Sequence, residues 1–138
     1  MVEVPPHPDR CATAIYEFFG LDGGRPGAAE ALVAKLEAAG RLQTARRLLG
    51  GKEAMLERTL SGWRVWVSRR LSGPERTFAA LHELGEWWLG QLRVGGPERE
   101  ATADLVAAAL VAPRARFRPL CERLGFDPPA LARHFGAT

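Results

Sequence analysis

Hydrophobic residues recur at intervals of three and four along four stretches of the chain, the spacing that buries one face of a helix. The four predicted helices cover residues 9–19, 28–39, 72–89 and 97–112. Asp9 is expected to cap the first helix, and the spacing of Ser72 and Glu75 is that of a capping box for the third. Pro97 suits the first turn of the fourth helix.

Residues 63–70, WRVWVSRR, show a period of two instead. Trp63, Val65 and Val67 alternate with the residues between them, which predicts a strand with two different faces. Residues 41–60 are compatible with a helix, a broken helix or a helix followed by a strand. The chain is therefore expected to have an α+β fold, mostly helical, with a small sheet of two to three strands packed on the helix of residues 72–89.

A stripe of core-type residues runs along this third helix, formed by Phe78, Leu81, Gly85, Trp88 and Leu92. We expect the stripe to face the core, with Gly85 allowing a neighbouring helix to approach closely. The following helix has the body ADLVAAALVA, which is apolar and small enough to predict that it is packed inside. The two helices should therefore lie against each other.

Polar pairs interrupt both of these helices at a spacing of one turn. His82 and Glu86 form one pair, and Glu100 and Asp104 form the other. His82 and Glu86 can supply two metal ligands, Glu83 can act on water as a general base, and Glu100 is the best candidate for a third ligand because a carboxylate in a buried helix is costly unless it is paired or bound to a cation. Asp104 is then placed to accept the second ring N–H of His82.

Simpler explanations exist for each half of this pattern. A histidine and two glutamates at this spacing arise by chance on many solvated helices, and acidic residues such as Glu98 and Glu100 are common in the first turn of a helix. The metal interpretation is favoured by the combination of two adjacent helices, each with a polar pair on an otherwise apolar surface. His7 and His134 are weaker candidates for a ligand nitrogen.

The order of a strand, RVWVSRR, a helix, RTFAALHELGE, and a second helix, EATADLVAAALVAP, resembles the ImmA/IrrE-type metallopeptidases, which are gluzincin-like enzymes. The match is closest over residues 64–113. The resemblance implies a zincin-like domain with His82 and Glu100 as ligands, Glu83 as general base and Asp104 as a supporting residue. It also implies hydrolysis of a peptide bond in a protein partner, commonly a helix-turn-helix repressor of a mobile element or a stress response.

Glu86 departs from that family, which has a second histidine there. One imidazole and two carboxylates neutralise a dication, whereas two imidazoles and one carboxylate leave a charge of +1. A neutral site makes the metal-bound water less acidic. Zinc catalysis depends on lowering the pKa of that water to about 7. The additional oxygen also makes the site harder, so Zn²⁺ is expected with Mn²⁺ or Fe²⁺ as alternatives.

Charge and composition add the remaining expectations. The 138 residues fit one domain, residues 1–138, and 19 basic against 16 acidic residues give a formal charge of only +3. Nucleic-acid binding through Arg64, Arg69, Arg70 and the arginines of 114–118 is disfavoured, because no aromatic and basic platform is apparent. The two distant cysteines and the lack of a long apolar run predict a cytoplasmic protein without a membrane segment.

Two functions follow as hypotheses. The first is a metal-dependent endopeptidase that acts on a protein substrate, and the second is a peptidase-like binding module that regulates a protein partner without catalysis. Glu86 is the feature that favours the second. Trp66 is a candidate for the substrate cleft, where an exposed strand edge could pair with an extended substrate, whereas Trp87 and Trp88 are more typical of core residues.

Overall fold

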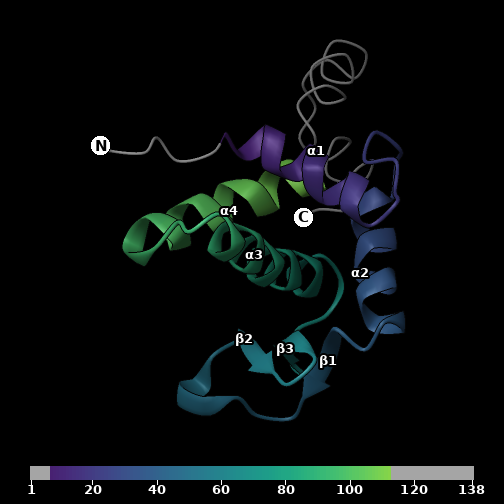
Figure 1. The fold of residues 1–138 in the computed structure, drawn as a ribbon. Coiled ribbons are helices and arrows are strands. Elements are labelled where there is room, and N and C mark those ends of the chain that lie inside the picture. Colours follow the sequence, from purple (N-terminus) through teal and green to yellow (C-terminus); the bar gives the residue numbers. More distant parts are fainter. Residues whose placement is uncertain (1–6, 113–138) are drawn as a thin grey trace.

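Four helices and a three-stranded sheet make up residues 7–112, the part of the chain that this computed structural model describes (Figure 1). The helices are α1 (Pro8–Phe18), α2 (Ala28–Ala38), α3 (Gly73–Gln91) and α4 (Gly96–Val111). The strands are β1 (Leu42–Ala45), β2 (Ala54–Thr59) and β3 (Gly62–Ser68), with a short 3₁₀ turn, η1 (Leu49–Gly51), between the first two. The predicted α+β class and all four predicted helices are confirmed.

The sheet has the order β1-β3-β2, with β1 parallel and β2 antiparallel to β3. Residues 41–60 therefore contain two strands, and the prediction of a helix at their start is wrong. Leu42 lies opposite Val65 and is buried, so the strand conformation joins this segment both to the sheet and to the core. Gly50 and Gly51 both have positive φ, a conformation that glycine adopts without strain and that ends regular structure there.

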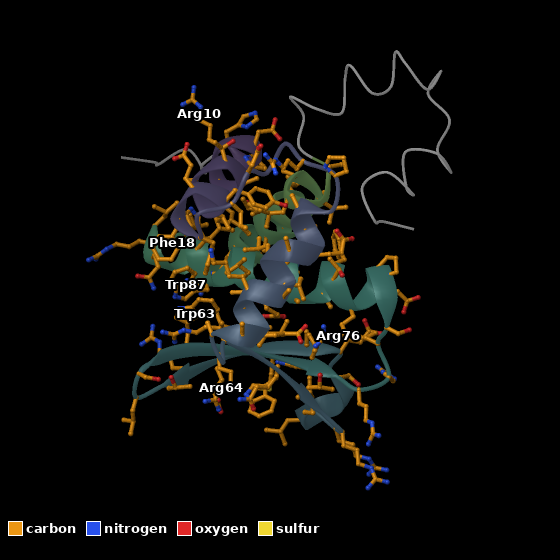
Figure 2. All side chains as sticks on the ribbon, turned by 90° about the vertical axis from the view of Figure 1, so that its right-hand side faces the viewer. Arg10, Phe18, Trp63, Arg64, Arg76 and Trp87 are labelled. Carbon is orange, nitrogen blue, oxygen red and sulfur yellow. The ribbon has the colours of Figure 1, made fainter. Side chains whose placement is uncertain are left out.

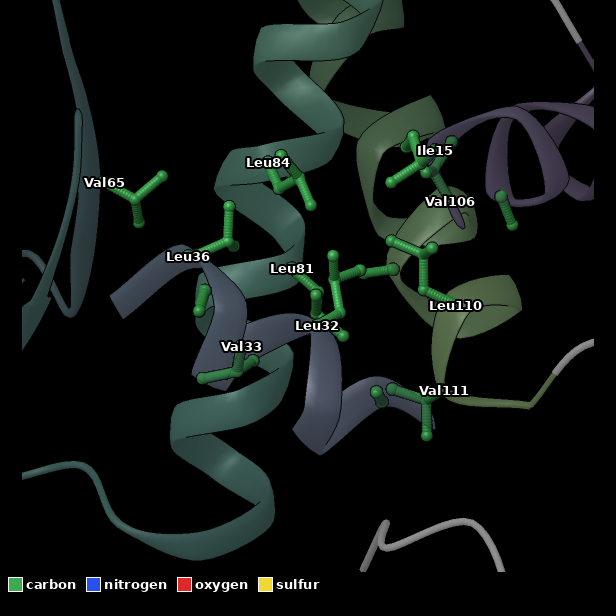
Figure 3. Packing of buried hydrophobic residues seen from close by; sticks show 14 of the residues in the cluster. Ile15, Leu32, Val33, Leu36, Val65, Leu81, Leu84, Val106, Leu110 and Val111 are labelled. Carbon is green, nitrogen blue, oxygen red and sulfur yellow. The ribbon is translucent and has the colours of Figure 1, made fainter. Parts of the chain in front are cut away.

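Helix α3 is the centre of the packing, with the sheet on one side and α4 on the other (Figure 1). Figure 3 shows Leu36 between Leu84 and Val65 at the sheet side, and Leu81 pointing toward Leu110 of α4. All of these side chains are fully buried. A fully buried leucine contributes about 1.5–3 kcal/mol relative to an exposed one, so this contact layer fixes the position of α3.

Gly85 lies where α3 and α4 pack closely against each other, the place predicted for it. A Cβ atom there would lie 3.4 Å from the carbonyl oxygen of Ala103 and 3.4 Å from Cγ1 of Val106. The ends of the predicted stripe are not buried, because Phe78 is 39% and Leu92 is 46% exposed. Phe78 lies on the wall of a pocket and Leu92 follows the last residue of α3, so neither side chain is covered by α4.

Two predicted helix caps are replaced by other arrangements. His7 is the N-cap of α1, and its Nδ1 accepts a hydrogen bond from the backbone N–H of Asp9, the residue expected to be the cap. Ser72 is the N-cap of α3, but its side chain makes no capping hydrogen bond. Gly73, the first residue of α3, has a φ of 54°, a left-handed conformation that glycine adopts without strain.

The helical layer is tied together by a buried hydrogen bond. The hydroxyl of Tyr16 in α1 donates to the carbonyl oxygen of Leu110 in α4.

Pro97 stands in the first turn of α4, as predicted. None of the helices in the described part of the chain combines the length and the apolar character that crossing a bilayer requires.

Candidate metal centre

The polar pairs of α3 and α4 face each other where the two helices pack together. The Nδ1 atom of His82 lies 2.7 Å from Oδ1 of Asp104, and Nε2 lies 3.1 Å from Oε2 of Glu100. The same Nε2 lies 3.7 Å from Oε2 of Glu86, one turn along α3. One ring thus has a carboxylate at one nitrogen and two carboxylates at the other.

Metal-type donors converge on one point in this arrangement. One donor atom each from His82, Glu86 and Glu100 lies within 4.8 Å of the others. A proton on Nδ1 donates to Asp104 and leaves the lone pair of Nε2 directed toward the two glutamates, which is how a carboxylate usually orients a ligating histidine. One nitrogen and two carboxylate oxygens suit Zn²⁺, Mn²⁺ or Fe²⁺, so the residues present fit the metal that the sequence predicts.

The exposure of these residues decreases from α4 to α3. The side chains of Glu100 and Asp104 are 65% and 62% exposed, whereas those of His82 and Glu86 are 15% and 16% exposed. The prediction that Glu100 is buried in α4 is therefore wrong. Its long side chain reaches His82 from the solvent side, so proximity and not burial makes it a candidate ligand.

Glu83 is a buried carboxyl group in the described core. Burial raises the pKa of Glu83 to about 8, with further contributions from a hydrogen bond with Glu86 and from the negative charges of Glu86 and Glu100, against a lowering effect of Lys52. Burial also raises the pKa of Glu86. Three carboxyl groups are thus crowded around one histidine, an arrangement in which a dication favours the ionised forms.

A pocket of about 750 Å³ adjoins this cluster and includes His82 and Glu83 in its lining. Its other walls come from the segment before β2 and from the first turns of α3, with Lys52 and Phe78 among them. The sequence pattern predicts Phe78 in the core stripe and does not single out Lys52. The loop sequence Gly50-Gly51-Lys52 before a strand was the available signal for Lys52, but only the tertiary structure shows that it adjoins Glu83.

Trp66 lies apart from this pocket. It belongs to β3, the central strand, so the predicted free strand edge at Trp66 is wrong, and the edges of the described sheet are β1 and β2. Among the strands, Ala54 at the start of β2 lines the pocket. Trp87 stacks on Trp63 with ring centroids 4.4 Å apart (Figure 2) and packs against the core, as expected for a core aromatic. Trp88 packs against the core as well.

His7 caps α1 and makes no contact with the cluster, since its side chain contacts Asp9. His134, Cys121 and the arginines of 114–118 lie outside the described residues. Within residues 7–112, the cluster of donors that could hold a metal ion is His82, Glu86 and Glu100, the residues predicted from the sequence.

Comparison with known proteins finds a matching family and a similar fold. The family described as Peptidase_M78, IrrE N-terminal-like domain, matches residues 39–138. Among solved structures, a Mycobacterium tuberculosis transcriptional regulator is similar in fold, with a TM-score of 0.71 and 19% sequence identity over 95% of this chain and 43% of that one. The chain therefore spans less than half the length of that protein. No curated protein matches the sequence.

Proposed function

The chain belongs to the IrrE N-terminal-like domain family of peptidases, and from this premise we propose that it is a metal-dependent endopeptidase that hydrolyses a peptide bond in a protein substrate. The observation that carries the proposal is the convergence of His82, Glu86 and Glu100, with their donor atoms within 4.8 Å, beside the buried carboxyl group of Glu83. The proposed domain covers residues 1–138.

His82, Glu86 and Glu100 would hold the cation, and Asp104 would keep His82 in the tautomer that presents Nε2. A divalent cation held there supplies Lewis acidity toward a peptide carbonyl and toward water. Glu83 would accept the proton of the attacking water and deliver it to the amide nitrogen as the C–N bond breaks. The pocket beside His82 and Glu83 provides room for the substrate chain.

The substrate class follows from the family and not from the pocket. We propose a protein partner such as a helix-turn-helix repressor of a mobile element or a stress response, and a cytoplasmic location. The structurally similar Mycobacterium tuberculosis protein is described as a transcriptional regulator, which is compatible with a role in transcription. Zn²⁺ is the proposed metal, with Mn²⁺ or Fe²⁺ as alternatives because two of the three donors are carboxylates.

Metal content and cleavage test the proposal together. The purified chain, loaded with Zn²⁺, Mn²⁺ or Fe²⁺ in turn, is expected to retain about one ion per chain and to cleave a co-encoded repressor. Glu100→Gln should weaken metal binding, whereas Glu98→Gln, an exposed carboxylate of the same helix, should not. Glu83→Gln should bind metal and fail to cleave. A chain that retains no ion, or cleavage that survives Glu83→Gln, would refute the proposal.

A second candidate function is supported by the burial of Glu83 beside the carboxyl group of Glu86, which raises the pKa of Glu83 to about 8. A base that is protonated at neutral pH is poorly placed to activate water, so the chain would bind the same partner without cleaving it. A stable complex that needs neither metal nor Glu83 would select this alternative. Glu86→His restores the usual nitrogen donor and removes the neighbouring carboxyl group, and activity gained only in this variant would identify Glu86 as the reason for inactivity.

A further inference from the structure

Charge is divided unevenly between the two layers of the molecule. Residues 41–70, which form the sheet and its connections, contain eight basic and two acidic residues, a formal charge of +6. The remaining described residues, 7–40 and 71–112, contain six basic and eleven acidic residues, a formal charge of −5. The small net charge of the whole chain thus conceals a basic sheet layer and an acidic helical layer.

The outer face of the sheet carries no helix in the described part of the chain. Helices α2 and α3 contact the sheet, and they cover the side where Trp63, Val65 and Val67 are buried. Figure 2 shows Arg64 pointing away from the helices, with Trp63 and Trp87 on the helical side of the sheet. Residues 64 and 66 of β3 therefore belong to an uncovered face.

Trp66 and Arg64 form the centre of this face. Trp66 is half-buried, its Nε1 donates to Oε1 of Glu57 at 3.1 Å, and the guanidinium carbon of Arg64 lies 5.6 Å from the centroid of a Trp66 ring. The Nε of Arg64 is shielded from solvent and has no hydrogen-bond partner among the described residues. The Trp66 indole, held by its hydrogen bond to Glu57, and the Arg64 guanidinium therefore lie side by side on this face.

Four arginines gather at one end of the same sheet. Strands β1 and β3 are parallel and in register from Leu42 opposite Val65 to Ala45 opposite Ser68, so the residues that follow them emerge together. These residues are Arg46 and Arg47 after β1, and Arg69 and Arg70 after β3, all exposed. The backbone N–H of Arg69 bonds the carbonyl oxygen of Ala45, which confirms that the two pairs are neighbours. Arg70 has a carboxylate partner, Glu53, at 3.6 Å.

We propose that this outer sheet face, defined by Arg64, Trp66 and the arginine pairs 46–47 and 69–70, binds single-stranded nucleic acid. The arginines contact successive phosphates, and an unpaired base stacks on the Arg64–Trp66 pair, since base stacking on aromatic and guanidinium planes is the usual mode for single strands. The distance from residue 64 to residue 69 along a strand is about 16 Å, which spans several nucleotides. In a duplex both faces of each base are covered by neighbouring base pairs, so no base is free to stack on Trp66.

This surface was not expected from the sequence, where basic and acidic residues balance overall and no aromatic and basic platform was apparent. The strand pairing creates the platform, because it brings arginines more than twenty positions apart to one end of the sheet. The proposal does not depend on the metal centre, which belongs to the helical layer.

Fluorescence anisotropy of a labelled oligothymidylate, measured with the full chain in the presence of a chelator, tests the proposal. If four phosphates are contacted, affinity should fall about 50-fold between 50 and 200 mM salt, from a slope of about −0.7 per contact. Arg46→Gln with Arg47→Gln should lower both the affinity and the slope. Arg10→Gln, at the opposite end of the molecule, is the matched control and should change neither (Figure 2).

Trp66→Leu separates stacking from charge. It should weaken binding of the single strand at least fivefold and leave the salt slope unchanged, and circular dichroism will show whether this variant is folded. Arg64→Gln provides a second variant that leaves the ring in place. Absence of binding at 50 mM salt, or an equal loss with Arg10→Gln, would overturn the proposal. Equal affinity for a duplex or for polyglutamate would overturn it in favour of a general polyanion surface.

Discussion

The carboxyl group of Glu83 makes the stability of the metal-free protein depend on pH. Burial and the neighbouring carboxylates raise its pKa from an ordinary 4.5 to about 8. Between these two pH values the folded chain holds a proton that the unfolded chain has lost. The stability contributed by this group is therefore complete below about pH 4.5 and is lost as the pH rises through 8.

The size of the effect follows from the same pKa values. Each pH unit between them corresponds to about 1.4 kcal/mol, so Glu83 alone costs about 3 kcal/mol at pH 7 and about 5 kcal/mol above pH 8. Glu83→Gln removes the titration but keeps the shape. Glu86 keeps a raised pKa in this variant, so part of the cost at pH 7 remains. We therefore expect the variant to be more stable than the parent chain by about 2 kcal/mol at pH 7.

Urea unfolding followed by circular dichroism, at pH 5, 7 and 8.5 with a chelator present, measures this difference. The gap between variant and parent should widen from pH 5 to pH 8.5. Glu98→Gln is the control for removing an exposed carboxylate and should show no such gap. Parallel stability curves for Glu83→Gln and the parent chain would refute the placement of Glu83 as a buried, crowded carboxyl group.

Three further predictions concern the metal centre and the helical core. Binding of Zn²⁺ at pH 7 should release a proton from the Glu83–Glu86 pair, so that calorimetric heats vary with the ionisation enthalpy of the buffer and affinity rises with pH toward 8; buffer-independent heats would contradict this. Tyr16→Phe should lower the free energy of unfolding by about 1–2 kcal/mol in urea titrations, because the Leu110 carbonyl loses its buried donor. Cys11 is buried and its pKa is raised by burial, so in a Cys121→Ser variant it should react with a thiol reagent at least tenfold more slowly when folded than in urea.

Glu86 is the residue on which the choice between enzyme and binding module depends. It places a third carboxyl group beside His82, and it helps to raise the pKa of Glu83. Both contacts change when histidine replaces it, because the site then has two nitrogen donors and Glu83 no longer has a carboxyl partner. Comparing the parent chain with Glu86→His therefore tests ligand identity and base availability in one experiment.

The sequence by itself determined the features that depend on local spacing. The i, i+4 placement of His82 and Glu86, and of Glu100 and Asp104, follows from the helical repeat, so these residues could be selected as candidate site residues before the structure was known, although the burial expected of Glu100 was wrong. The helix boundaries followed from the hydrophobic period and from glycine and proline positions. The capping hydrogen bonds expected at Asp9 and Ser72 did not, since His7 caps α1 and the Ser72 side chain, although Ser72 is the N-cap of α3, makes no capping bond.

Only the tertiary structure decided the features that depend on contacts between distant segments. The strand character of Leu42–Ala45 exists because β3 supplies its hydrogen-bond partners, and no local period in residues 41–60 indicates that pairing. The exposure of Glu100, the position of Lys52 beside Glu83 and the collection of arginines at one end of the sheet arise in the same way. A residue's spacing fixes which face of its own element it occupies, but packing fixes what that face meets.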